Sequence, residues 1–241
     1  MTRTDKIIIV ITAILIFFVA FVPATLENFK ALTKAYPYLT SFVKFSFFNT
    51  FGECLALRIV SGSYYNKNFG LLSKIIIWGF LGLGIKAAFS IFVYGVPAML
   101  ATTPLNDIVA TQSTLAHFIT AFSISLCMNS IFAPVFMTLH KITDGHIYDH
   151  KGSIRALITP IDMRKQFNAI NWDMQWGFIF KKTIPLFWLP AHTITFLLPS
   201  DFRVLFAAAL GVALGVMLAF SNMQRTENPS PATKGMVENN A

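Results

Sequence analysis

Polar and ionisable side chains inside apolar stretches are the residues of this chain best suited to chemistry. Ser46, Asn49 and Glu53 follow three- and four-residue steps, so a helix would place them on one face. A charge within lipid costs roughly 2.5 to 3.5 kcal/mol on insertion scales, so this face should turn toward the inside of a bundle. The stripe predicts the wall of an aqueous path, in which Glu53 would favour cations or pair with a passing solute.

The same residues have an alternative, structural role. A salt bridge from Glu53 to Lys86, or hydrogen bonds along the stripe, would hold helices together without any path. His117 and His192 also lie within apolar stretches, where each imidazole either lines a path or bonds to a neighbouring helix. The full set of predicted path-lining residues is Ser46, Asn49, Glu53, Lys86, His117 and His192.

A second group of ligand-type side chains lies in the segment LHKITDGHIYDHKGS, residues 139–153, which we read as a loop. Imidazoles and carboxylates at this spacing could bind Zn²⁺ and support hydrolysis. Neither HExxH nor a cysteine-based spacing is present, and polar loops collect His and Asp without a ligand role. We therefore expect no metal, His146 and His150 being the weak candidates. The other members of the group are His140, Asp144 and Asp149.

The remaining sequence offers no catalytic pattern. No nucleophile with an adjacent base and no Walker-type phosphate loop is visible. We therefore predict a protein that is not an enzyme and has no cofactor.

The elements that carry these residues are long apolar segments. Hydrophobic residues make up 55% of the chain, charged residues only 12%, and the mean hydropathy is +0.61. A lipid core of roughly 30 Å takes about 20 helical residues, and backbone groups in lipid must be satisfied within the segment. We predict an all-α, polytopic helical membrane bundle with about six apolar segments, four to six of them spanning. They lie near 7–26, 38–60, 71–100, 115–139, 183–199 and 203–222.

The ends of the chain complete the predicted organisation. Residues 1–223 should form one transmembrane helical domain, and 224–241 a disordered polar tail. Residues 1–24 also resemble a cleavable signal peptide, although a signal anchor fits better because further apolar segments follow. Pro185, Pro190 and Pro199 predict that the last two segments form a proline-kinked hairpin.

Small residues predict close helix packing in two segments. Gly79, Gly82 and Gly84 lie in WGFLGLGIKAAF, and the last segment repeats a small residue at every fourth position. Such faces allow tight crossings within the bundle, or between copies in a homo-oligomer. The residues of the second face are Ala207, Gly211, Gly215 and Ala219.

The charge distribution predicts the orientation. Lys and Arg are most frequent on the side that would hold both termini, which is the cytoplasmic or equivalent side. The formal charge of +8 is scattered between apolar segments, so the lipid bilayer, and not nucleic acid, is the expected partner. The predicted location is the bacterial cytoplasmic membrane or an organellar inner membrane.

Two longer stretches carry a family resemblance. FKALTKAYPYLTSFVKFSFFNTFGE has an aromatic-rich opening, a proline before the helix and a Gly-acid pair, while FWLPAHTITFLLPSDFRVL has a Trp-Pro pair and a later proline and arginine. In order, these features resemble the Mpv seventeen and peroxisomal membrane protein twenty-two family of small organellar membrane proteins. The matching residues are Pro37, Gly52, Glu53, Gly79, Gly84, Trp188, Pro190, Phe196, Pro199 and Arg203.

The chain departs from that family pattern at several positions. Leu57 replaces a Gln, Ile85 replaces a Pro, and both the first apolar segment and the loop near 140–170 are additions. The resemblance implies a channel or permeability factor for small metabolites or ions. We therefore expect a membrane path for small solutes, with a non-transporting scaffold or interaction protein as the alternative. A metal-dependent membrane enzyme using residues 140–150 is the third reading.

Overall fold

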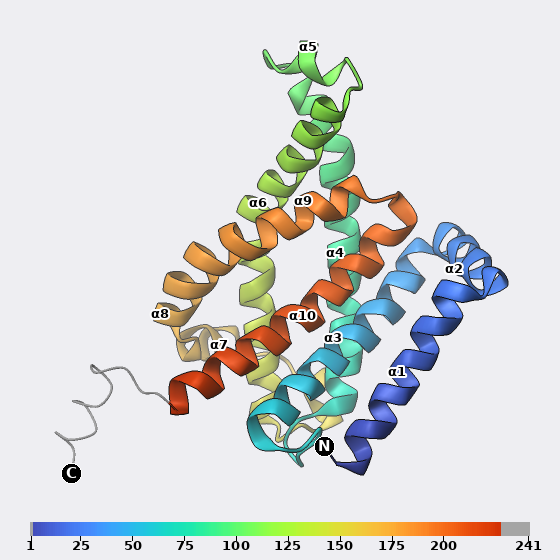
Figure 1. Cartoon of the computed structure of the whole chain (residues 1–241). Coiled ribbons are helices and arrows are strands. Elements are labelled where there is room, and N and C mark those ends of the chain that lie inside the picture. Colours follow the sequence, from blue (N-terminus) through green and yellow to red (C-terminus); the bar gives the residue numbers. More distant parts are fainter. Residues whose placement is uncertain (1, 228–241) are drawn as a thin grey trace. The chain divides into compact units, whose positions relative to one another are not determined.

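The computed structural model describes residues 2–227, except for the side chains of residues 15, 16, 18–21 and 220–227. Every regular element in this range is a helix (Figure 1), which confirms the all-α prediction. Two compact units divide the chain, Met1–Thr40 and Ser41–Ala241. Most of the predicted tail, residues 228–241, lies outside the described range, whereas 224–227 continue the last helix.

The first unit holds α1 (Arg3–Phe21), α2 (Pro23–Ala35) and the beginning of α3. The first predicted segment, 7–26, is therefore split between two helices. Val22 is extended, with φ −105° and ψ 101°, because the ring of Pro23 disfavours helical geometry in the preceding residue. Pro23 itself begins α2, where its missing N–H breaks no helical hydrogen bond.

In the second unit, α4 and α6 pack side by side and carry much of the core. α4 is Leu71–Leu100, the range predicted from the sequence, and α6 is Thr114–Asp149. The short α5 (Asn106–Val109) lies in the connection between them, at the far end of both helices in Figure 1. Ser113 caps α6 by accepting the N–H of Ala116 at 3.2 Å. The core between α3, α4, α6, α9 and α10 includes Phe45, Trp78, Phe89, Met128 and Phe196.

The predicted loop at 140–150 is wrong, because α6 remains helical to Asp149. Its residues continue the helical period: Ile142, Thr143, His146 and Ile147 are all buried. The helix ends where Lys151 and Gly152 take positive φ values of 52° and 73°. The chain then passes through η1 (Ile154–Leu157) and α7 (Met163–Ala169).

The next helical stretch contains a segment whose backbone is wound more widely than in an α-helix, with hydrogen bonds between residues five apart. α8 (Trp172–Met174) leads into η2 (Gln175–Trp188), a π-helix, and then into α9 (Leu189–Leu197). Pro185 lies within η2 and has no N–H to donate, so the regular bonding is locally incomplete. Thr183 Oγ1 donates to the Phe178 carbonyl five residues back, at 3.4 Å. α9 ends at Leu197, and α10 (Ser200–Glu227) begins just after Pro199.

α3 (Pro37–Ser61) crosses α4 and α10 at small residues. A Cβ added to Gly82 would lie 2.5 Å from the Cβ of Phe45, and one added to Gly52 would lie 2.9 Å from the Cα of Val212. Gly79 similarly meets Phe42 and Ser46, whereas nothing lies within 4 Å of the added Cβ at Gly84. Gly84 therefore makes no close helix contact within this chain. The other predicted small residues on α10, Ala207, Gly211, Gly215 and Ala219, are buried or partly buried within this chain.

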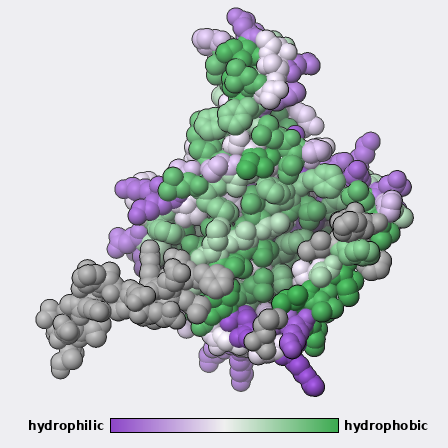
Figure 2. All heavy atoms as spheres, in the orientation of Figure 1, coloured by the Kyte–Doolittle hydropathy of each residue, from purple (hydrophilic) through white to green (hydrophobic). Residues whose placement is uncertain are grey.

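Three of the described helices are long and apolar enough to cross a membrane: Leu71–Leu100, Thr114–Asp149 and Ser200–Ala219. Figure 2 shows apolar residues over much of the visible face, with polar ones gathered mainly toward its ends and edges. Large apolar side chains such as Ile91, Ile131 and Val135 are more than 60% exposed. In water such a surface would be unfavourable, so this all-helical fold is compatible with an integral membrane protein.

Candidate functional site

A cluster of charged and polar side chains joins α3, α4 and α6. Lys74 on α4 places its Nζ 2.5 Å from Oε2 of Glu53 on α3 and 2.7 Å from Oδ1 of Asp144 on α6. Trp78, one turn after Lys74, donates its indole N–H to Glu53 Oε1 at 2.7 Å. One ammonium group therefore bridges two carboxylates from two other helices. We call Glu53, Lys74, Trp78, His140 and Asp144 the ion cluster.

His140 adds a titratable group to the ion cluster. Its Nε2 lies 3.8 Å from Glu53 Oε1 and its Nδ1 lies 3.8 Å from Asp144 Oδ2. The imidazole packs on the Trp78 ring, with 4.4 Å between the ring centroids. The His140 Nδ1 atom is buried and makes no hydrogen bond to the described residues. With a neutral imidazole, the cluster carries two negative charges and one positive charge.

On one side of the ion cluster lies a partly open cavity of about 220 Å³. Its wall is mainly apolar, and it is formed by α3, α4, α6, η2, α9 and α10. Glu53, Trp78 and His140 of the cluster contribute to this wall. We call this space the inner cavity. Its other polar lining residues include Asn49, Asn129, Thr183, Trp188 and His192.

The polar groups of the inner cavity differ in how well they are paired. Asn129 Nδ2 lies 3.1 Å from His192 Nδ1 and also donates to the Ser125 carbonyl at 2.9 Å. His192 stacks on Trp188 with 5.0 Å between ring centroids. By contrast, neither Asn49 Nδ2 nor Trp188 Nε1 has a hydrogen-bond partner among the described residues, although both atoms are buried.

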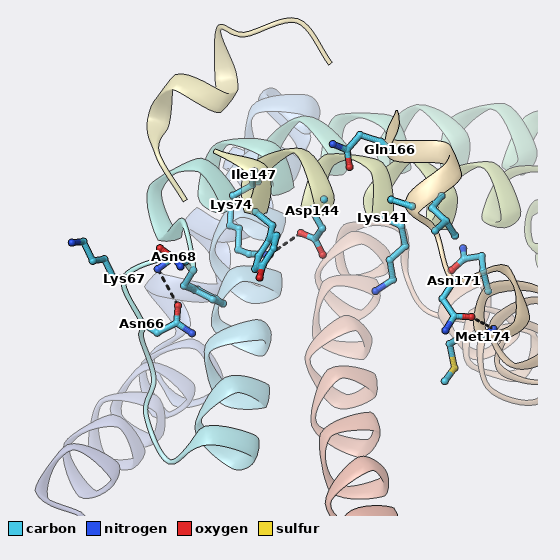
Figure 3. A pocket seen from close by; sticks show the side chains of 16 residues that line it. Asn66, Lys67, Asn68, Lys74, Lys141, Asp144, Ile147, Gln166, Asn171 and Met174 are labelled. Atoms are coloured by element: carbon cyan, nitrogen blue, oxygen red, sulfur yellow. Dashed lines mark hydrogen bonds and ion pairs between the residues drawn. The ribbon is translucent and has the colours of Figure 1, made fainter. Parts of the chain in front are cut away.

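On the other side lies an open pocket of about 750 Å³, shown in Figure 3. In this view Lys74 and Asp144 reach toward each other from neighbouring helices, and Lys141 extends from the preceding turn of α6. We call this space the outer pocket. Its further polar lining residues are Asn66, Lys67, Asn68, Tyr148, Gln166, Asn171 and Gln175.

A second ion pair supports the rim of the outer pocket. Asp149 Oδ2 accepts from Gln166 Nε2 at 2.7 Å and lies 2.8 Å from Lys165 Nζ. The Asp149 carboxylate raises the pKa of Lys165, through the hydrogen bond first and the opposite charge second. The Gln166 side chain also packs against Gly145, where any Cβ would clash with its Oε1 atom. These contacts hold α7 against the last turns of α6.

The ion cluster separates the two spaces. Lys74 and Asp144 line the outer pocket, while Glu53 and His140 line the inner cavity. Lys141 lines both. The contacts between Lys74 and its two carboxylate partners therefore join residues that line the two spaces.

Three of the six predicted path-lining residues lie on the inner cavity: Asn49, Glu53 and His192. The other three do not. Ser46 is buried against Gly79, and His117 is exposed near the beginning of α6. Lys86 donates to Ser90 Oγ at 3.3 Å. The predicted alternative was a salt bridge from Glu53 to Lys86. The partner is wrong, because Glu53 forms its salt bridge with Lys74.

Sequence reasoning missed most of the ion cluster. Lys74 lies near the beginning of an apolar segment and was not singled out, while His140 and Asp144 were assigned to a loop. A signal was present: Lys74 with Trp78, and His140 with Asp144, are each four residues apart. Extending the helical period of α6 past residue 139 would have placed the second pair on one face. Asn129 was also missed as the partner of His192.

Metal-ligand geometry occurs in the ion cluster and not at the predicted histidines. Ligand atoms of Glu53, His140 and Asp144 lie within 4.8 Å of one another. The Lys74 ammonium already contacts both carboxylates, so a positive charge occupies this position. His146 Nε2 lies 3.0 Å from the Ala156 carbonyl, and His150 Nδ1 lies 2.8 Å from the His146 carbonyl. The backbone therefore engages both predicted candidates.

Comparison with known proteins adds no assignment to this geometry. No family model, no curated protein and no solved structure matches the chain.

Proposed function

We propose that this protein forms a path for small solutes or ions across a membrane, with the ion cluster as its gate. One observation carries the proposal: two spaces in the same helical unit meet at the cluster, and Lys141 lines both of them. Two spaces that meet at one cluster of ionic side chains are the arrangement expected of a path closed at one point. The resemblance of the sequence to the Mpv seventeen family, residue by residue at Gly52, Glu53 and Trp188, supports the same function.

The gate would work through the bridging ammonium group of Lys74. Because this one group contacts carboxylates on both α3 and α6, movement of either helix breaks one contact and leaves the other. Ionisable side chains within membrane segments typically face the bundle interior and mark such paths. The partly exposed positions of Glu53 and Asp144, at 22% and 30%, leave them accessible to a solute once Lys74 moves.

The membrane arrangement that we propose retains four to six spans and both termini on the cytoplasmic or equivalent side. α4, α6 and α10 supply three spans. The proline-rich turn between α9 and α10 would let these helices act as a hairpin that moves during opening.

A scaffold protein is the second candidate, and one observation favours it. Lys74 and its two carboxylates satisfy one another, and interhelical pairs of this kind also stabilise bundles that transport nothing. The two functions differ in what happens when the cluster is broken. A gate opens, whereas a structural bridge only becomes weaker.

The test is solute release from liposomes that contain the purified full chain. We expect the wild-type protein to release a small encapsulated dye faster than empty liposomes do, and Lys74→Met to release it faster still. Lys86→Met is the matched control, because it removes a lysine from the same helix outside both spaces. Release equal to that of empty liposomes for all three proteins would refute the path.

A further inference from the structure

Two cationic side chains of the apolar helices α4 and α10 lie beside the same packing contact. Phe89 of α4 packs on Phe196 of α9, with 5.0 Å between the ring centroids. Lys86 lies three residues before Phe89, on the same face of α4. Arg203 of α10 donates its Nε–H at 2.9 Å to the carbonyl of Leu198, two residues after Phe196. The positive charges of Lys86 and Arg203 are close enough to repel each other.

Neither of these cations has a carboxylate partner among the described residues. Lys86 Nζ lies 3.3 Å from the hydroxyl oxygen of Ser90, and Arg203 Nε bonds to a backbone carbonyl. The two terminal nitrogen atoms of Arg203 make no hydrogen bond to a described residue, and both keep some accessible surface. A ligand can therefore reach the guanidinium group.

The neighbouring charged groups leave an excess of positive charge. Lys44 of α3 is a third cation, and its side chain is buried. Its charge is repelled by that of Lys86 and attracted by that of Asp201, in the first turn of α10. Among the described residues, three cations and one carboxylate therefore gather where α3, α4 and α10 approach one another.

Lys74, one of the other cations of α4, is compensated in a way that Lys86 is not. The Lys74 ammonium group contacts carboxylates on two other helices, whereas Lys86 has a hydroxyl group as its side-chain partner. A charge within an apolar segment is costly, and like charges at short range add repulsion to that cost. An anion supplied from outside the chain would provide the missing compensation.

Phosphate is the anion that these two cations fit. A guanidinium group presents a planar fork of donors that matches phosphate oxygens, and an ammonium group binds phosphate as a point charge. Arg203 lies near the beginning of Ser200–Ala219, a helix long and apolar enough to cross a membrane. Lipid headgroups lie at the ends of such spans. The N-terminus of α10 adds partial positive charge at the same place.

We propose that Lys86 and Arg203 bind a phosphate group between α4 and α10, carried either by an anionic phospholipid or by a free phosphate ion. The site is separate from the ion cluster, and its occupation does not require that anything is transported. The release and denaturation measurements that use Lys86→Met as a control contain neither ligand, so the site stays empty in them.

The first test is native mass spectrometry of the full chain in a neutral detergent, which counts bound lipid molecules. Phosphatidylglycerol is the anionic probe, and phosphatidylcholine, whose choline cancels the phosphate charge, is its neutral counterpart. If the source is a lipid, we expect the first phosphatidylglycerol molecule to bind about tenfold more tightly than phosphatidylcholine, through charge-assisted hydrogen bonds.

The second test is calorimetric titration of the same protein with inorganic phosphate, with chloride as the comparison. Saturable binding of phosphate that displaces phosphatidylglycerol would identify the free ion as a ligand. Phosphatidylglycerol selectivity without phosphate binding would identify the lipid headgroup. Equal affinity for the two lipids together with no binding of inorganic phosphate would overturn the inference.

Variants then locate the site. Lys86→Met and Arg203→Met each remove one cation and should weaken binding of the preferred probe about tenfold. Arg203→Lys keeps the charge and should restore part of the binding lost in Arg203→Met. Lys182→Met is the matched control, because it removes an exposed lysine of η2.

Two outcomes of the variants would overturn the site. One is unchanged binding in both Lys86→Met and Arg203→Met. The other is an equal loss in Lys182→Met, which would show attraction to the total charge of the protein. If Arg203→Met fails to fold, Lys86→Met and its control still decide. A failure of the liposome release test leaves these binding measurements untouched, so the path and the phosphate site stand or fall separately.

Discussion

The outer pocket and the inner cavity lie on either side of one ion cluster, but they differ in the polar and ionic side chains that line them. Around the outer pocket, Lys74, Asp144, Asp149 and Gln166 all form ion pairs or hydrogen bonds between side chains, although the buried Gln175 Nε2 atom has no partner among the described residues. In the inner cavity, buried nitrogen atoms of Asn49 and Trp188 have no partner among the described residues. The two spaces differ more clearly in charge: paired ionic side chains gather at the outer pocket, whereas the wall of the inner cavity is mainly apolar.

The largest expected effect comes from removing the bridge between the two spaces. Lys74→Met leaves the carboxylates of Glu53 and Asp144 facing each other without a cation, which should destabilise the protein by about 3 kcal/mol. The measurement is the midpoint of thermal denaturation in detergent, with Lys86→Met as the control. A Lys74→Met midpoint no lower than that of the control would show that the bridge contributes little.

A smaller effect is expected at the wall of the inner cavity. Gly211→Ala should displace the flexible Asn49 amide and cost about 1 kcal/mol, because the added Cβ would occupy the position of the Asn49 Oδ1 atom. Gly215→Ala is the matched control one turn later, where the added Cβ would meet the Gly52 carbonyl oxygen at an ordinary 3.7 Å. Thermal denaturation of both variants checks this difference. Equal midpoints would contradict the close approach of α10 to Asn49.

The smallest effect is expected at the rim of the outer pocket. The pKa of Lys165 is raised by Asp149, so this pair favours the folded state at neutral pH. The contribution is fully present below the unfolded pKa of about 10.4 and is lost as the pH rises through the higher folded value. Lys165→Met should therefore lower the denaturation midpoint slightly at pH 8 and not at strongly alkaline pH. A difference independent of pH would contradict the pairing.

Helix periodicity explains how much of the fold was predictable. The range of α4 was predicted to the residue, because a long apolar run is bounded by a glycine-containing turn before it and by polar residues after it. The end of α6 was misplaced because His140, Asp144 and Asp149 suggested a polar loop. Burial of His146 and Ile147 between them keeps that stretch helical.

The candidate site was predictable only in part, because local sequence shows which residues are unusual within one helix but not which residues of other helices they contact. Glu53 and Asn49 stand out as polar residues in an apolar helix, and this local contrast was sufficient to find them. Nothing local distinguishes Lys74 from Lys86 as the partner of Glu53, since both lie on α4. The choice depends on which end of α4 lies beside residue 53 of α3.

By itself, the sequence determined that the chain is helical, that its helices are apolar enough for a membrane, and that Asn49 and Glu53 share a face. These properties depend on residue type and on the 3.6-residue period, which act within one segment. The tertiary structure alone decided that Lys74 bridges Glu53 and Asp144, that Asn129 pairs with His192, and that the buried nitrogen atoms of Asn49 and Trp188 have no partner among the described residues. Each of these depends on how helices distant in sequence cross, and the crossings are set by close approaches at residues such as Gly52 and Gly82.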